Sequence, residues 1–153
     1  MNTTYQLSNI LVIGSGGAGL SAAIAAKAQG LEVTVIGKRR KEDAHTVLAA
    51  GGINAAFGHM DTEDSWQQHF ADTMIEGYML SEPRMVELMA QESLAAVKEI
   101  DEWGANFAKQ DDGRFQQRYF GAHTYRRTCF SGDYTGRSIL RALVQKASDQ
   151  DIP

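Results

Sequence analysis

The stretch Asn9-Ile10-Leu11-Val12-Ile13-Gly14-Ser15-Gly16-Gly17-Ala18-Gly19 decides how this chain folds. Residues 10–13 are a short apolar run, which is typical of a strand buried on both faces of a parallel sheet. Gly14 permits the tight turn that follows, Gly16 lets the backbone approach a pyrophosphate, and Gly19 lets the next helix pack closely on the strand. The stretch therefore predicts a strand–turn–helix corner that binds a dinucleotide.

The flanking sequence supports this interpretation, because a glycine pattern alone is a weak signal. Residues 18–29 are rich in alanine and favour a helix, and Gly30 suits the end of that helix. Residues 32–36 have the apolar, β-branched composition of a second strand. The free N–H groups at the start of the helix would face the pyrophosphate. We therefore predict an α/β protein with a Rossmann-like, doubly wound parallel sheet.

One element of the dinucleotide pattern is missing at the end of the second strand. An acidic residue normally follows there and binds the ribose hydroxyl. Here Ile36 is followed by Gly37-Lys38-Arg39-Arg40. The departure from the NAD pattern fits the 2′-phosphate of NADP or a flavin adenosine held in another way. A solvated basic loop over residues 38–41 is the remaining interpretation.

Composition places the chain among soluble enzyme domains. The chain has 153 residues, about one domain. Its net charge is −4, from 15 basic and 19 acidic residues, which gives no reason to expect a nucleic-acid partner. Cys129 is the single cysteine, so an intrachain disulfide and a cysteine-bound iron–sulfur cluster within the chain are both excluded. We expect a buried thiol there and no metal site.

The rest of the chain predicts three helices and a turn. The first helix is expected to be capped within residues 61–64, the second to start at Pro83 and end near Gly104, and the last to be capped by Asp133 or Thr135 and run to about Ser148. Apolar residues at helical spacing mark the buried faces of the first two: Trp66, Phe70, Met74 and Gly77, then Val86, Met89, Ala90, Val97 and Ile100. Residues 111–113, Asp-Asp-Gly, predict a turn. Because these elements do not complete a doubly wound sheet, we expect residues 1–153 to be the N-terminal part of a longer protein.

Several motifs occur in an order that resembles the flavoprotein subunit of succinate dehydrogenase and fumarate reductase. After the glycine turn come His45-Thr46-Val47, Gly51-Gly52-Ile53-Asn54-Ala55-Ala56, Trp66, His69, Asp72-Thr73, Asp112-Gly113-Arg114, Gln117-Arg118-Tyr119-Phe120-Gly121 and Asp133-Tyr134-Thr135-Gly136. The resemblance implies that residues 1–153 are the N-terminal part of an FAD-binding domain, with the remainder and a capping domain lying outside them. It also accounts for the missing acidic residue, since the family's second strand likewise ends without one, and this leaves FAD rather than NADP as the expected cofactor.

The resemblance assigns site residues by position. Those expected to bind FAD are Gly14, Ser15, Gly16, Gly17, Ala18, Gly19, Gly37, Lys38, His45, Thr46, Val47, Ala49, Gly51 and Gly52; those expected at the dicarboxylate are Gly52 and Phe120. In the family, the histidine at the position of His45 is bonded through a ring nitrogen to the flavin 8α carbon. A neutral imidazole is a good nucleophile near pH 7, so the chemistry suits the residue. Two positions depart from the family: Ala50 replaces a glutamine or glutamate, and Ala122 replaces a glycine.

The activity implied by the resemblance is hydride transfer between flavin N5 and a carbon of succinate or fumarate. No catalytic residue is expected within residues 1–153, because the family's proton-transfer arginine lies beyond Pro153, and this segment alone should be inactive. Electrons would leave through an iron–sulfur partner subunit, and a membrane anchor subunit would be contacted indirectly, at the cytoplasmic side of a membrane. Two alternatives remain open: an L-aspartate oxidase, and a non-catalytic nucleotide-binding fragment.

Overall fold

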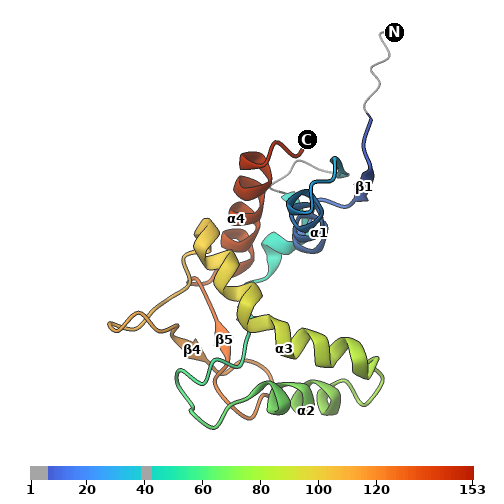
Figure 1. Cartoon of the computed structure of the whole chain (residues 1–153). Coiled ribbons are helices and arrows are strands. Elements are labelled where there is room, and N and C mark those ends of the chain that lie inside the picture. The colour runs from blue at the N-terminus through green and yellow to red at the C-terminus, as the bar shows by residue number, and fades with distance from the viewer. Residues whose placement is uncertain (1–6, 39–42) are drawn as a thin grey trace.

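The computed structural model describes residues 7–38 and 43–153 (Figure 1). In chain order its elements are β1 (Ile10–Ile13), α1 (Gly17–Ala28), β2 (Val33–Ile36), the 3₁₀ helix η2 (His45–Leu48), β3 (Ile53–Asn54), α2 (Trp66–Glu76), α3 (Pro83–Ile100), the π-helical turn η3 (Asp101–Ala105), β4 (Gln117–Arg118), β5 (Thr128–Cys129) and α4 (Thr135–Asp149). The basic loop expected over residues 38–41 lies outside the described residues except for Lys38.

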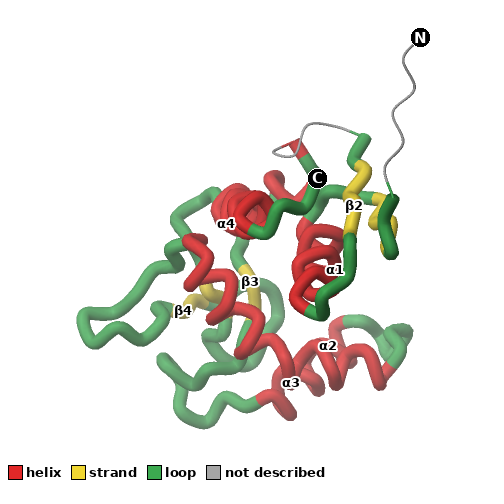
Figure 2. The backbone as a smooth tube through the Cα atoms, turned by 45° about the horizontal axis from the view of Figure 1, so that its top comes forward, coloured by secondary structure: helices red, strands yellow, loops and turns green. Residues whose placement is uncertain are grey.

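The start of the chain forms the predicted strand–turn–helix–strand unit. β1 and β2 are parallel and in register from Ile10 opposite Val33 to Ile13 opposite Ile36. α1 connects them and lies beside β2 (Figure 2). Gly30 has a φ of +79°, the left-handed conformation that ends many helices, as expected from the sequence. The predicted α/β class is confirmed.

The expectation that β1 is buried on both faces is wrong for the described residues. Leu11 is 54% exposed and Ile13 is 83% exposed. The reason is that β1 pairs only with β2 in the described part of the chain, and α1 and α4 pack on one side of this pair. The other side of the strand is left open to solvent.

The three predicted helices are present, but the N-terminal caps of α2 and α4 differ from the predictions. α2 starts later than expected, since Ser65 caps it by accepting a hydrogen bond from the Gln68 N–H group. The expected caps Asp61 and Asp64 are engaged elsewhere, as described below. No side chain caps α4, and the Thr135 hydroxyl instead accepts a hydrogen bond from the Ser131 N–H group. α3 starts at Pro83 as expected and is capped by the Glu82 carboxylate.

A small antiparallel sheet, which the sequence did not predict, follows the dinucleotide unit. Its strand order is β3-β5-β4, so the two-residue strand β5 lies between β4, which directly precedes it among the strands, and β3, which is far from it in the sequence. The predicted turn at residues 111–113 is confirmed, and Gly113 has a φ of +84°. This sheet brings the segment after η2 beside the segment around Phe120.

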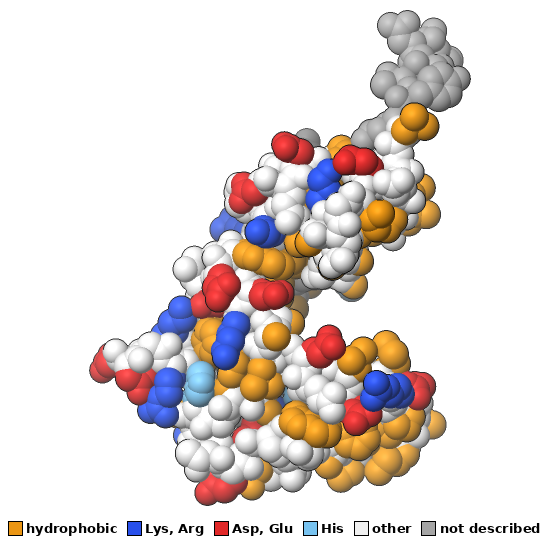
Figure 3. All heavy atoms as spheres, in the orientation of Figure 1, with side chains coloured by type: hydrophobic (Ala, Val, Ile, Leu, Met, Phe, Trp, Pro, Cys, Tyr) orange, Lys and Arg blue, Asp and Glu red, His pale blue; other side chains and the backbone are white. Residues whose placement is uncertain are grey.

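α4 joins two hydrophobic clusters. Leu140, Leu143 and Ala147 pack against α1 and β2, whereas Ala142 packs with the end of α3 and with residues of the small sheet. The tip of the α2–α3 hairpin exposes apolar side chains, which form an orange area at the lower right of Figure 3: Ile75, Tyr78, Met79, Leu80 and Met85. Among the helices of the described residues, none has both the length and the apolar composition needed to cross a bilayer.

Candidate dinucleotide site

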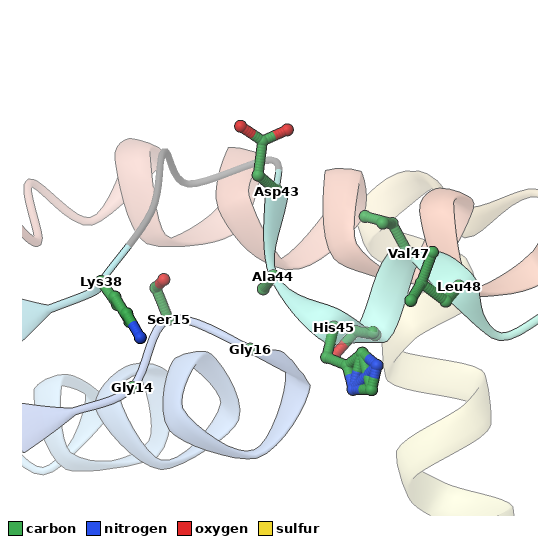
Figure 4. Close-up of a pocket in the computed structure, with 10 residues that line it drawn as sticks. Gly14, Ser15, Gly16, Lys38, Asp43, Ala44, His45, Val47 and Leu48 are labelled. Atoms are coloured by element: carbon green, nitrogen blue, oxygen red, sulfur yellow. The ribbon is translucent and has the colours of Figure 1, made fainter.

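A cavity of about 1000 Å³ lies between the glycine turn and the segment that carries His45. Its lining residues are Gly14, Ser15, Gly16, Lys38, Asp43, Ala44, His45, Thr46, Val47 and Leu48. Figure 4 shows Lys38 beside Ser15, with residues 43–48 passing the same turn from the other side. The cavity is large enough for a cofactor of dinucleotide size. Two motifs that are almost 30 residues apart in the sequence thus form one site.

The glycine turn has the geometry that its sequence predicts. Gly14 has a φ of +125°, which a residue with a side chain rarely adopts. A side chain on Gly19 would overlap the Gly14 carbonyl, so the absence of one allows α1 to start directly against the end of β1. A side chain on Gly16 would come within 3.3 Å of the Thr46 hydroxyl. The turn therefore keeps its backbone accessible at the positive end of α1, which suits a pyrophosphate.

The second side of the cavity is the short helix η2, which carries His45, Thr46 and Val47. The Thr46 hydroxyl accepts a hydrogen bond of 3.0 Å from the Gly17 N–H group, and so joins η2 to the start of α1. Val47 packs against the α1–α4 cluster. His45 lines the cavity, as an attachment point for a flavin must. These residues fit FAD, because the cradle and the candidate tether face the same space.

The expected substrate-side residues lie next to one another on the small sheet, outside the cavity lining. The Phe120 ring covers Gly51 so closely that a side chain on Gly51 would overlap it. Gly52 has a φ of +128° and lies against Thr128 and the Cys129 carbonyl. Phe120 itself is 55% exposed, so one side of its ring is free to meet a ligand. Ala49, Gly51, Gly52 and Phe120 are thus neighbours of the cavity rather than part of its wall.

Arg118 is a site neighbour to which the sequence motifs assign no role. Its guanidinium group donates a hydrogen bond of 2.9 Å to the Gly51 carbonyl and lies 4.3 Å from the centre of the Phe130 ring. The cation therefore holds the paired-glycine turn against the small sheet. No sequence signal marked this contact, because it depends on the pairing of strands that are far apart in the chain.

Buried charged residues fix the loop that carries Phe120. Arg127 is completely buried and pairs with Asp64 at 2.8 Å and with Asp72 at 2.9 Å. Asp72 also accepts hydrogen bonds from the backbone and the hydroxyl of Thr124, which anchors the end of that loop to α2. His123 is 2.8 Å from the Asn54 amide and so ties the loop to β3.

The environment of this cluster shifts the pKa values of its members. Burial raises the pKa of Asp64, and the charge of Arg127 only partly opposes the effect. Burial acts in the same direction on Asp72, but the hydrogen bonds from Thr124 and Gln68 and the charge of Arg127 outweigh it, so the pKa of Asp72 is lowered. Burial, followed by the charges of Arg127 and His123, lowers the pKa of His69 to about 4. We interpret the cluster as structural, since its members are buried away from the cavity lining.

We expect His69 to make the folded protein sensitive to acid. Its pKa is about 4 when folded and 6.5 when unfolded, so unfolding takes up a proton between these values. The free energy of unfolding should fall by about 3 kcal/mol as the pH drops from 6.5 to 4, in addition to the contribution of other groups. When denaturant unfolding is measured at several pH values, the free energy of unfolding should depend less steeply on pH in His69→Gln than in the wild type. An equal pH dependence in the two proteins would contradict this assignment.

The glycine turn and η2 together define a dinucleotide-binding site, and comparison with known proteins identifies the family. Residues 9–153 match the family described as FAD binding domain. The chain belongs to this family, and the resemblance noted from its motifs is confirmed.

Its relatives include proteins named as subunits of fumarate reductase and of succinate dehydrogenase. One subunit of the fumarate reductase (CoM/CoB) of Methanothermobacter marburgensis is 41% identical over 99% of the chain and 28% of the relative. The succinate dehydrogenase flavoprotein subunit of Rickettsia bellii is 34% identical over 95% of the chain and 26% of the relative. The solved structure of Mycobacterium smegmatis Sdh1 in complex with UQ1 is 48% identical, with a TM-score of 0.90 over 93% of the chain and 24% of the matched chain. The chain thus spans about a quarter of the length of these proteins.

Proposed function

We propose that this chain is the N-terminal part of the FAD-binding domain of a flavoprotein that interconverts succinate and fumarate. The observation that carries the proposal is the cavity in which the glycine turn and the His45 segment face each other. The turn would hold the FAD pyrophosphate, Lys38 would lie near the phosphates, and η2 would run along the flavin. The flavin supplies the hydride chemistry when it is bound.

We further propose that His45 carries the flavin covalently. The attachment would join a ring nitrogen of His45 to the 8α carbon of the flavin. It breaks one N–H and one C–H bond and releases two protons and two electrons, which an acceptor such as fumarate or oxygen would take up. The position of His45 in the cavity lining supports this assignment. A covalent bond to the ring is expected to raise the flavin potential, which favours oxidation of succinate.

The substrate side of the flavin would be formed by Gly52 and Phe120. Phe120 packs on Gly51 with one face of its ring, and its free face would meet a flat dicarboxylate. The proposed route for the electrons is an iron–sulfur partner subunit, with a membrane anchor subunit reached through it at the cytoplasmic side of a membrane. The relatives named as subunits support an assembly of this kind.

Assays of a full-length flavoprotein that contains this chain test the proposed reaction. Succinate oxidation coupled to a dye, and fumarate reduction by a reduced dye, should both exceed the rate with L-aspartate. Faster turnover of L-aspartate would replace the proposal with an L-aspartate oxidase. A protein that binds FAD but turns over none of these substrates would leave only the nucleotide-binding role.

A further inference from the structure

We propose that Gly136, at the start of α4, is a positioning residue that sets the location of His45 in the cavity. The inference rests on the proposed function of His45 and concerns what holds its helix in place. The helix η2 is only four residues long, none of them is buried, and no side chain caps its start. A single 3₁₀ turn of this kind has little stability of its own. Its position must therefore come from its neighbours.

The first neighbour is α4, which meets η2 at Gly136. The Gly136 N–H group donates a hydrogen bond of 2.7 Å to the Ala49 carbonyl, which directly follows η2. A side chain on Gly136 would overlap the Thr46 carbonyl and would come within 2.9 Å of the Ala49 side chain. Because the overlapping atoms include η2 backbone, a rotamer change cannot relieve the clash. An alanine at this position must push η2 away from α4.

The second neighbour is α1, through the hydrogen bond from the Gly17 N–H group to the Thr46 hydroxyl. Thr46 therefore contacts both helices, with its side chain on α1 and its carbonyl against Gly136. His45 precedes Thr46 directly, so a displacement of this residue moves the imidazole relative to the glycine turn that holds the pyrophosphate. The starts of α1 and α4 thus hold η2 between them.

Covalent attachment depends on this placement more than cofactor binding does. Misplacing a reacting group by about 1 Å can slow a reaction about 100-fold. Noncovalent binding depends chiefly on the turn at residues 14–19, which Gly136 does not touch. Gly136→Ala should therefore retain bound FAD and lose most of the covalent fraction.

The flavin experiment compares two variants of the full-length flavoprotein with the wild type. Gly136→Ala disrupts the contact between α4 and η2, and Ser148→Ala changes an exposed residue in the last turn of the same helix. Apoprotein is mixed with FAD, and the acid-stable flavin fluorescence is followed over time beside the total bound flavin. We expect attachment to slow about 100-fold in Gly136→Ala at equal total flavin, and to be normal in Ser148→Ala.

A second measurement does not require a flavin. Amide hydrogen exchange over residues 44–49 of the apoprotein should accelerate about tenfold in Gly136→Ala and in Thr46→Val, as expected for the loss of one hydrogen bond, while exchange in α3 stays unchanged. A wild-type attachment rate in Gly136→Ala together with wild-type exchange in Gly136→Ala and Thr46→Val would overturn the inference. A loss of total flavin in Gly136→Ala that parallels the loss of covalent flavin would also overturn it, because it would show a merely structural role. If Gly136→Ala does not fold, exchange is compared between the apoproteins of Thr46→Val, which loses the hydroxyl that holds η2 on α1, and Thr46→Ser, which keeps it. Equal exchange over residues 44–49 in these two variants would overturn the inference. If the wild type never forms the covalent bond, the proposed tether is contradicted. The hydrogen-exchange measurement then tests the positioning role separately.

Discussion

A His45→Ser variant of the full-length flavoprotein should bind FAD and release all of it on acid precipitation. The cradle at residues 14–19 is untouched by the substitution, so the cofactor should still bind. The nucleophile for the 8α carbon is gone, so no covalent flavin can form. The flavin potential should fall, and succinate oxidation should lose more activity than fumarate reduction, because only the oxidation needs a strongly oxidising flavin.

The matched control is His59→Ser, since His59 is a histidine outside the cavity lining. That variant should keep its covalent flavin and its wild-type ratio of the two activities. Gel fluorescence under ultraviolet light and a potentiometric titration provide the readouts. Acid-stable flavin in His45→Ser would assign the tether to another residue.

Gly16→Val should abolish flavin binding altogether. The new side chain would lie 3.3 Å or less from the Thr46 hydroxyl and would project where the backbone must approach the pyrophosphate. The effect differs from that of His45→Ser, because the substitution removes the cofactor rather than the bond to it. Ala28→Val adds similar bulk at the exposed end of α1 and should leave the flavin content unchanged. A Gly16→Val protein with normal flavin content would contradict the assignment of the cradle.

Short-range features of this chain were predictable from the sequence, and the long-range ones were not. The turn at Gly14 depends on residues within ten positions of it, so strand, turn and helix could be predicted together. Asp61 and Asp64 have the composition of helix caps. Instead they pair with Arg126 and Arg127, more than 60 residues away, and Ser65 caps α2. Local propensity could not show that the two arginines would compete for these carboxylates.

The small sheet was missed for a related reason. Each of its strands is two residues long, which is too short to show an alternating pattern. The sheet nevertheless brings Phe120 onto Gly51 and allows Arg118 to reach the Gly51 carbonyl. The resemblance identified Phe120 and the paired glycines by position, but the role of Arg118 emerges only once the strands pair. Gly136 likewise belongs to one of the motifs of the resemblance, but its proposed role depends on the contact between α4 and η2, which no local pattern predicts.

Mass spectrometry of the tryptic peptide spanning residues 42–84 tests the central claim most directly, since this peptide contains His45. The protein should be the full-length flavoprotein, purified with its flavin and digested after acid precipitation. The peptide should be heavier by one FAD less two hydrogen atoms, and fragmentation should place the addition on His45. An unmodified peptide from flavin-replete protein would contradict the covalent assignment, and a purified protein without flavin would contradict the site itself.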